Sequence, residues 1–157
     1  FNPVYNAIYP FLIKKLAESR DKMIRFLRKL IQYSIAISVC IFLLFHLLLP
    51  KITQILLGSE FMDNMMISRI FSLLIVVIPL SFIFSKLVLL PFKYDRIFLK
   101  IYFSGFLFNI LFITLFVVAL EWNALGAAIA NVVVETLLVI IMLNVIYRNR
   151  ILHNRAT

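Results

Sequence analysis

A single carboxylate lies in the middle of an otherwise apolar stretch near the end of the chain. Residues 126–145 read GAAIANVVVETLLVIIMLNV, and Glu135 is the only ionisable residue among them. A charged side chain at the centre of a bilayer costs about 2.5 to 3.5 kcal/mol on insertion scales. We therefore expect Glu135 to be protonated or hydrogen-bonded, and to face protein rather than lipid.

Two amides are predicted to lie near this carboxylate. Ala127, Asn131 and Glu135 follow one another at four-residue steps, which places them along one face of a helix. Asn109 and Glu135 lie at similar distances on either side of a turn expected at 121–122. Both are thus predicted near the bilayer midplane, on adjacent antiparallel helices, with Asn109 as the hydrogen-bond partner of Glu135.

Two roles fit this polar group. Glu135 is a proton or cation site that couples transport to an ion gradient, or it is a structural hydrogen-bond node between helices. Its predicted neighbours, Asn109 and Asn131, are amides rather than a second carboxylate or a base. That composition favours the structural role, and ion coupling is the alternative.

The rest of the sequence lacks the residue patterns of common catalytic and cofactor sites. Cys40 is the only cysteine, so a disulfide or a thiolate metal cluster within the chain is excluded. The sequence has no glycine-rich phosphate loop, no paired histidine ligands and no nucleophile elbow. We expect no enzyme activity, no cofactor and no metal site.

The elements that position these residues are predicted to be transmembrane helices. Hydrophobic residues make up 64% of the chain and the mean hydropathy is +1.05, which indicates an all-α integral membrane protein. A helix needs about 20 apolar residues to cross a bilayer. Four continuous stretches meet that length, and the predicted bundle comprises helices over 30–50, 70–91, 99–120 and 123–147. Pro79 should kink the second helix, as a hinge or as a fixed bend.

Shorter segments connect and flank these spans. The residues before Lys14 are too few to cross a bilayer, so 1–13 is interpreted as the tail of a truncated helix, and the chain as the C-terminal part of a larger protein that lacks an N-terminal lobe. The apolar spacing on either side of Gly58 predicts short helices lying on the outer membrane surface. The predicted segments are a basic cytoplasmic loop or interfacial helix at 14–29, a periplasmic segment at 51–69, a cytoplasmic turn at 92–98, a periplasmic turn at 121–122 and a cytoplasmic tail at 148–157.

The distribution of charge predicts the orientation. The net charge is +9, and fourteen of the sixteen Lys and Arg residues lie before the first span, around the second turn or in the tail. Basic connections stay in the cytoplasm, so the C-terminus is predicted to be cytoplasmic. Because the basic residues are dispersed over several loops, we expect membrane lipids as partners and no nucleic acid.

Three segments resemble a known family. They are YNAIYPFLIKKLAES at 5–19, PKITQILLGSEF at 50–61 and LEWNALGAAIANVVVE at 120–135. In order and spacing they are similar to the C-terminal half of Wzx-type O-antigen and polysaccharide flippases, in the multidrug, oligosaccharidyl-lipid and polysaccharide exporter superfamily. The resemblance implies a twelve-helix, two-lobe transporter, of which this chain holds the last four helices.

The resemblance also implies an activity. Such flippases move undecaprenyl-diphosphate-linked oligosaccharide, such as an O-antigen repeat unit for lipopolysaccharide, across the bacterial inner membrane by alternating access. Lys14, Lys15 and Arg20 in the basic segment are candidates for contacts with the lipid-diphosphate headgroup. The family's cavity residues lie mainly in helices outside this sequence. The alternatives are a multidrug or cation antiporter of the same superfamily, and a membrane-embedded glycan-processing enzyme or polymerase.

Overall fold

Helices form every regular element in the part of the chain that the computed structural model describes, which comprises residues 10–14, 18–58 and 65–152. Four of them are long and apolar enough to cross a membrane: Arg20–Ile55, Met65–Leu89, Asp95–Ala119 and Asn123–Arg148. The predicted all-α membrane bundle with four spans is therefore confirmed, and the protein is a multi-pass membrane protein.

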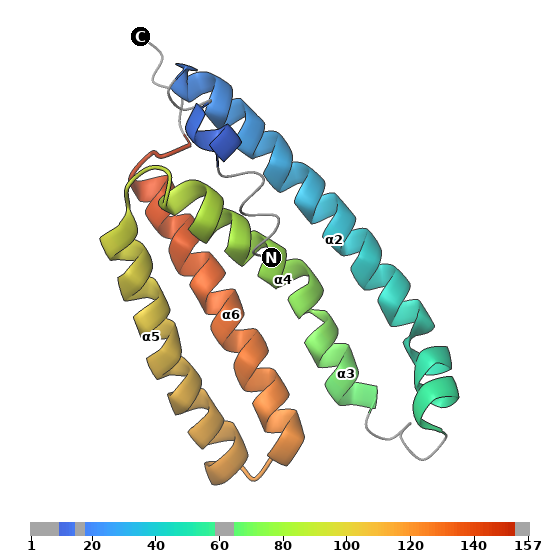
Figure 1. Cartoon of the computed structure of the whole chain (residues 1–157). Helices are drawn as coiled ribbons and strands as arrows, with labels where there is room; N and C mark the ends of the chain where they lie inside the picture. Colours follow the sequence, from blue (N-terminus) through green and yellow to red (C-terminus); the bar gives the residue numbers. More distant parts are fainter. Residues whose placement is uncertain (1–9, 15–17, 59–64, 153–157) are drawn as a thin grey trace.

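Helix α6 (Asn123–Arg148) lies in the middle of the bundle (Figure 1). It packs against α5 (Asp95–Ile113) on one side and against α3 (Met65–Ser72) and α4 (Leu74–Phe82) on the other. The long helix α2 (Arg20–Leu57) packs on α3 and α4, and its backbone does not come close to that of α6. The four spans thus lie side by side in the order α5, α6, α3–α4, α2.

The main apolar core lies at the end of the bundle where α2 begins and α6 ends. Met23 and Leu27 of α2, Val88 of the π-helix η2 (Ile83–Leu89) and Met142 of α6 are all fully buried there. Toward its other end α2 exposes apolar side chains, such as Ile55 at 80%. We call the packed end, with its many Lys and Arg residues, the basic end; the bundle is held together mainly there.

The first span differs from its predicted limits at both ends. It is predicted over 30–50, but α2 begins at Arg20 and continues through Pro50 to Leu57. The basic segment is helical because Met23 and Leu27, one turn apart, pack into the core. Beyond Pro50 the helix persists because proline removes only one backbone hydrogen bond and Thr53, 6% exposed, keeps the next turn packed. Gly58, at φ +88°, ends the helix.

The second span begins earlier than predicted and is divided at Leu73 rather than at Pro79. It starts at Met65, so helices lie before and after Gly58. They are not the short surface helices that were predicted, because each one is continuous with a membrane span. At the break, the backbone N–H groups of Val76 and Val77 both bond to the Leu73 carbonyl, at 3.1 and 3.3 Å. Pro79 lies inside α4, and η2 follows that helix directly.

The third and fourth spans lie close to their predicted positions. The third runs through α5 and a second π-helix, η3 (Thr114–Ala119), so it begins at Asp95 instead of residue 99. The fourth is α6, which ends at Arg148 against the predicted 147. After α6 the chain returns to the core, where Ile151 is 1% exposed. At the other terminus, residues 10–14 are helical and Leu12 is fully buried, while 1–9 lie outside the described residues.

Candidate functional site

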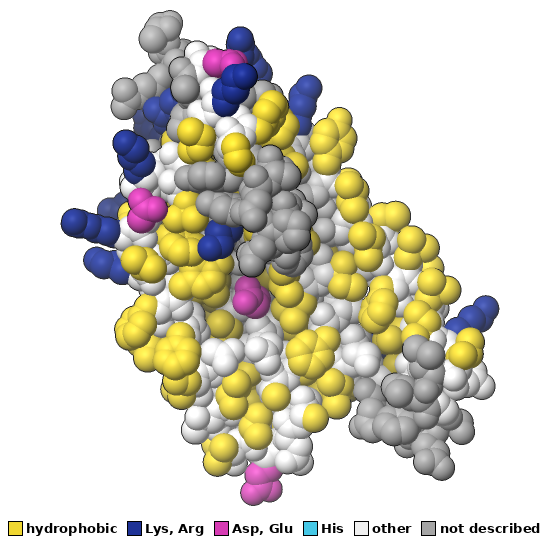
Figure 2. Space-filling model, viewed as in Figure 1, with side chains coloured by type: hydrophobic (Ala, Val, Ile, Leu, Met, Phe, Trp, Pro, Cys, Tyr) yellow, Lys and Arg dark blue, Asp and Glu magenta, His cyan; other side chains and the backbone are white. Residues whose placement is uncertain are grey.

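Glu135 lies in the middle of α6 on the side that faces α4. Its partly buried carboxyl forms a hydrogen bond with the side chain of Ser81, which is 5% exposed. Figure 2 shows that acidic side chains are few on the visible face and lie apart from one another, while hydrophobic side chains cover much of its middle. The carboxylate therefore takes its partner from α4, a helix that the sequence did not single out for this contact.

The two predicted amides pair with each other instead of with Glu135. Asn109 Nδ2 on α5 donates to Asn131 Oδ1 on α6 at 3.3 Å. Asn131 Nδ2 in turn donates to the Ala127 carbonyl at 2.9 Å, one turn earlier on α6. The prediction that Asn109 is the partner of Glu135 is thus wrong, because α6 presents Asn131 to α5 and Glu135 to α4.

These polar side chains join α6 to both of its neighbours. One hydrogen bond connects Asn131 to α5, and the other connects Glu135 to α4. Interhelical hydrogen bonds of this kind hold membrane helices at a fixed rotation and height. Among the described residues, no three His, Cys, Asp or Glu side chains gather closely enough to hold a metal ion. The arrangement can hold helices together, and Glu135 alone in it can exchange a proton.

Pro79 borders an apolar groove between α2 and α3–α4. The groove has a volume of about 530 Å³, and its few polar lining groups include Ser34 and Ser38 of α2. Pro79 thus faces the seam along which α2 packs on the second span. A hinge at Pro79 stays a prediction.

The three predicted headgroup contacts are placed differently from one another. Lys14 is exposed, and Lys15 lies outside the described residues. Arg20 is also exposed, but its guanidinium lies 5.6 Å from the centre of the Phe92 ring and donates to the Ile151 carbonyl at 3.4 Å. Arg20 therefore connects α2 to the segment after α6, in addition to any contact with lipid.

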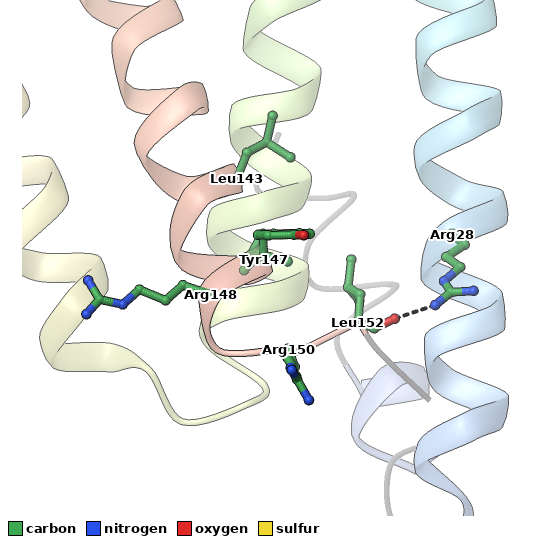
Figure 3. Close-up of a pocket in the computed structure, with 7 residues that line it drawn as sticks. Arg28, Leu143, Tyr147, Arg148, Arg150 and Leu152 are labelled. Carbon is green, nitrogen blue, oxygen red and sulfur yellow. Dashed lines mark hydrogen bonds between the residues drawn. The ribbon is translucent and has the colours of Figure 1, made fainter. Parts of the chain in front are cut away.

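A second basic feature escaped the sequence analysis. A groove of about 640 Å³ lies between the start of α2 and the end of α6, and we call it the basic groove. The described residues that line it are Arg28, Leu143, Ile146, Tyr147, Arg148, Arg150 and Leu152. In Figure 3, Leu143 and Tyr147 project from α6 toward α2, while Arg28 reaches from α2 to the Leu152 carbonyl. No local signal identified this groove, because Arg28 and Arg150 are far apart in the sequence.

The arginines of the basic groove differ in their surroundings. Arg28 donates one hydrogen bond, to the Leu152 carbonyl at 2.5 Å. Arg150 projects from the turn after α6, and its side chain forms no hydrogen bond or ion pair with a described residue. The Arg148 side chain extends toward α5, away from Arg28 (Figure 3). Two guanidinium groups, those of Arg28 and Arg150, thus remain available to an anion in the groove.

No family model, no curated protein and no solved structure matches the chain.

Proposed function

We propose that this chain forms part of the second lobe of a transporter that flips undecaprenyl-diphosphate-linked oligosaccharide across the bacterial inner membrane by alternating access. The observation that carries the proposal is the order of the three flippase-like segments at 5–19, 50–61 and 120–135. The four-span helical architecture supports it, because the lobes of such a transporter are built from membrane-spanning helices.

Packing at the third segment also supports the proposal. Gly126 begins the close contact between α6 and η3: a Cβ added at this position would lie 2.7 Å from the Phe116 carbonyl oxygen. Ala128 and Ala130, on the following turn, are fully buried. Small residues at these positions let the last two spans approach closely, as expected for a rigid part of a lobe.

The function is tested with the intact transporter that contains this chain, reconstituted in proteoliposomes. We expect a fluorescent lipid-diphosphate oligosaccharide to move between leaflets, measured as the fraction that a membrane-impermeant quencher reaches. Exchange of a lipophilic cation for protons, without movement of the lipid, would instead identify the antiporter. Conversion of the glycan to a new product would identify the enzyme.

One substitution distinguishes the structural role of Glu135 from an ion-coupling role. Glu135→Gln keeps a side chain that hydrogen-bonds with Ser81 but removes the ionisable group. Because a structural node needs only the hydrogen bond, we expect the variant to retain most of the wild-type flipping rate at every pH of the assay. A loss of flipping of about tenfold or more, with normal insertion, would identify an ion-coupling site instead. Ser81→Ala is the control that removes the same hydrogen bond and keeps the carboxyl.

A further inference from the structure

We propose that the basic groove binds an anionic phospholipid of the surrounding membrane. The phosphate lies between Arg28 and Arg150, and one acyl chain runs along Leu143 and Tyr147 of α6. This inference does not depend on the proposed transport of oligosaccharide.

The charge of the groove selects an anion. A guanidinium carries five N–H donors, and Arg28 uses one of them on the Leu152 carbonyl. The Arg150 side chain has no hydrogen-bond or ion-pair partner among the described residues, and the described residues that line the groove include no carboxylate. Arginine binds phosphate oxygens through two parallel hydrogen bonds, so the guanidiniums of Arg28 and Arg150, which both line the groove, suit a phosphate group.

The change from polar to apolar along the groove selects a lipid over a free phosphate ion. Arg150 lies beyond the end of α6, Tyr147 lies in its last turn, and Leu143 lies one turn deeper. Tyr147 and Leu143 are 86% and 45% exposed, so they offer apolar surface beside the guanidiniums. Basic pockets between transmembrane helices are typical sites for anionic lipid headgroups.

The backbone holds Arg150 in place. Its φ is +48°, a left-handed conformation that usually selects glycine after a helix. Two hydrogen bonds fix it there: Arg150 N–H donates to the Tyr147 carbonyl at 3.0 Å, and Ile151 N–H donates to the Ile146 carbonyl at 3.1 Å. These backbone hydrogen bonds hold Arg150 in a strained conformation. Its side chain therefore extends from a hydrogen-bonded turn beside Leu152.

The proposal is tested by quenching of tryptophan fluorescence with brominated lipids. The chain carrying Tyr147→Trp and Trp122→Phe has one tryptophan, in the basic groove, and is reconstituted in phosphatidylcholine vesicles. Brominated phosphatidylglycerol should bind there at least about fivefold more tightly than brominated phosphatidylcholine, because each of the two arginines attracts anionic lipid by roughly that factor. The unchanged chain, whose Trp122 follows η3 at the opposite end, should show no such preference.

Substitutions then test whether the preference for anionic lipid comes from the groove. The double variant Arg28→Gln, Arg150→Gln should bind the two brominated lipids with nearly equal affinity, so that the ratio of affinities is close to one. Arg96→Gln, which removes an exposed charge of α5 outside the groove, should leave that ratio unchanged. If the double variant does not reconstitute, Arg150→Gln alone should lower the ratio, since it leaves the bond between Arg28 and Leu152 intact.

Three results would overturn the proposal. Equal quenching by the two lipids in the reporter chain would show that the groove does not select an anion. An equal loss of preference in Arg96→Gln would show that it comes from the general charge of this end. Abolition by inorganic phosphate, but not by chloride at the same ionic strength, would show that the groove takes the free ion instead of the lipid.

Discussion

Glu135 and Asn131 lie one turn apart on α6 but bond to different helices. Four residues rotate a helical position by about 40°. Both side chains therefore lie on nearly the same face of α6, and each reaches a different neighbouring helix: Asn131 bonds to Asn109 of α5, and Glu135 bonds to Ser81 of α4. The polar residues at the centre of the bundle are therefore two separate contacts, each of which holds one neighbouring helix.

The amide contact is tested by a double-mutant cycle in which Asn109 and Asn131 are replaced by alanine, singly and together. Each single replacement should lower the free energy of unfolding by about 0.6 to 1.7 kcal/mol, the range of interhelical hydrogen bonds in membranes. The second replacement should then cost less than the first, because the bond at 3.3 Å is already lost. Unfolding by sodium dodecyl sulfate in mixed micelles measures these energies. Fully additive effects would contradict a direct bond.

At the scale of elements, two helical segments end in the same unusual way. After η2, Lys93 has φ +63°, and its N–H donates to the Leu90 carbonyl while Tyr94 N–H donates to the Leu89 carbonyl. Arg150 has the corresponding conformation and bonds after α6. Glycine is the usual residue here, but a cation at a helix C-terminus interacts favourably with the helix dipole. The chain thus ends helices at the basic end with basic residues.

The helix end at Arg150 predicts opposite results for two neighbouring substitutions. Arg150→Gly should raise the free energy of unfolding by about 1 kcal/mol, because glycine adopts a positive φ without steric cost. Arg148→Gly, which removes the same charge from inside the last turn of α6, should lower it by about 1 kcal/mol. Unfolding in mixed micelles compares the two. Equal changes would show that charge, and not backbone conformation, determines stability at this end.

At the scale of the whole molecule, the spans are held together mainly at the basic end. Residues from α2, η2 and α6 share one buried cluster there, and Arg20 and Arg28 bond to the carbonyls of Ile151 and Leu152. Away from this end α2 exposes a long apolar surface, including Leu47 at 75%. In the proposed transporter, lipid or the other lobe covers that surface.

The orientation of the whole molecule is tested by labelling single cysteines. In a chain with Cys40→Ser, Arg96→Cys lies at the basic end and Glu121→Cys lies at the opposite end, in the turn before α6. Basic connections stay in the cytoplasm, so an impermeant maleimide should label position 121 from outside the cell and position 96 only in inverted vesicles. The reverse pattern would contradict the predicted cytoplasmic C-terminus.

The sequence alone determined the features that depend on local composition and on distance along the chain. Continuous apolar runs identified four helical spans, because a bilayer sets the length of a spanning helix. Counting residues from the turn at 121–122 placed Asn109 and Glu135 at similar depth, because every helical residue advances by the same rise. The clustering of Lys and Arg in alternate connections supplied the predicted orientation.

Only the tertiary structure decided which residues meet. Hydropathy and periodicity say how deep a side chain lies, but not which helix stands beside it or how that helix is rotated. The order of the spans makes Ser81 the hydrogen-bond partner of Glu135, and Asn131 the partner of Asn109. The same order brought Arg28 beside Leu152, across most of the chain, and formed the basic groove. Long-range packing of this kind has no local pattern, because it depends on how all four helices pack together.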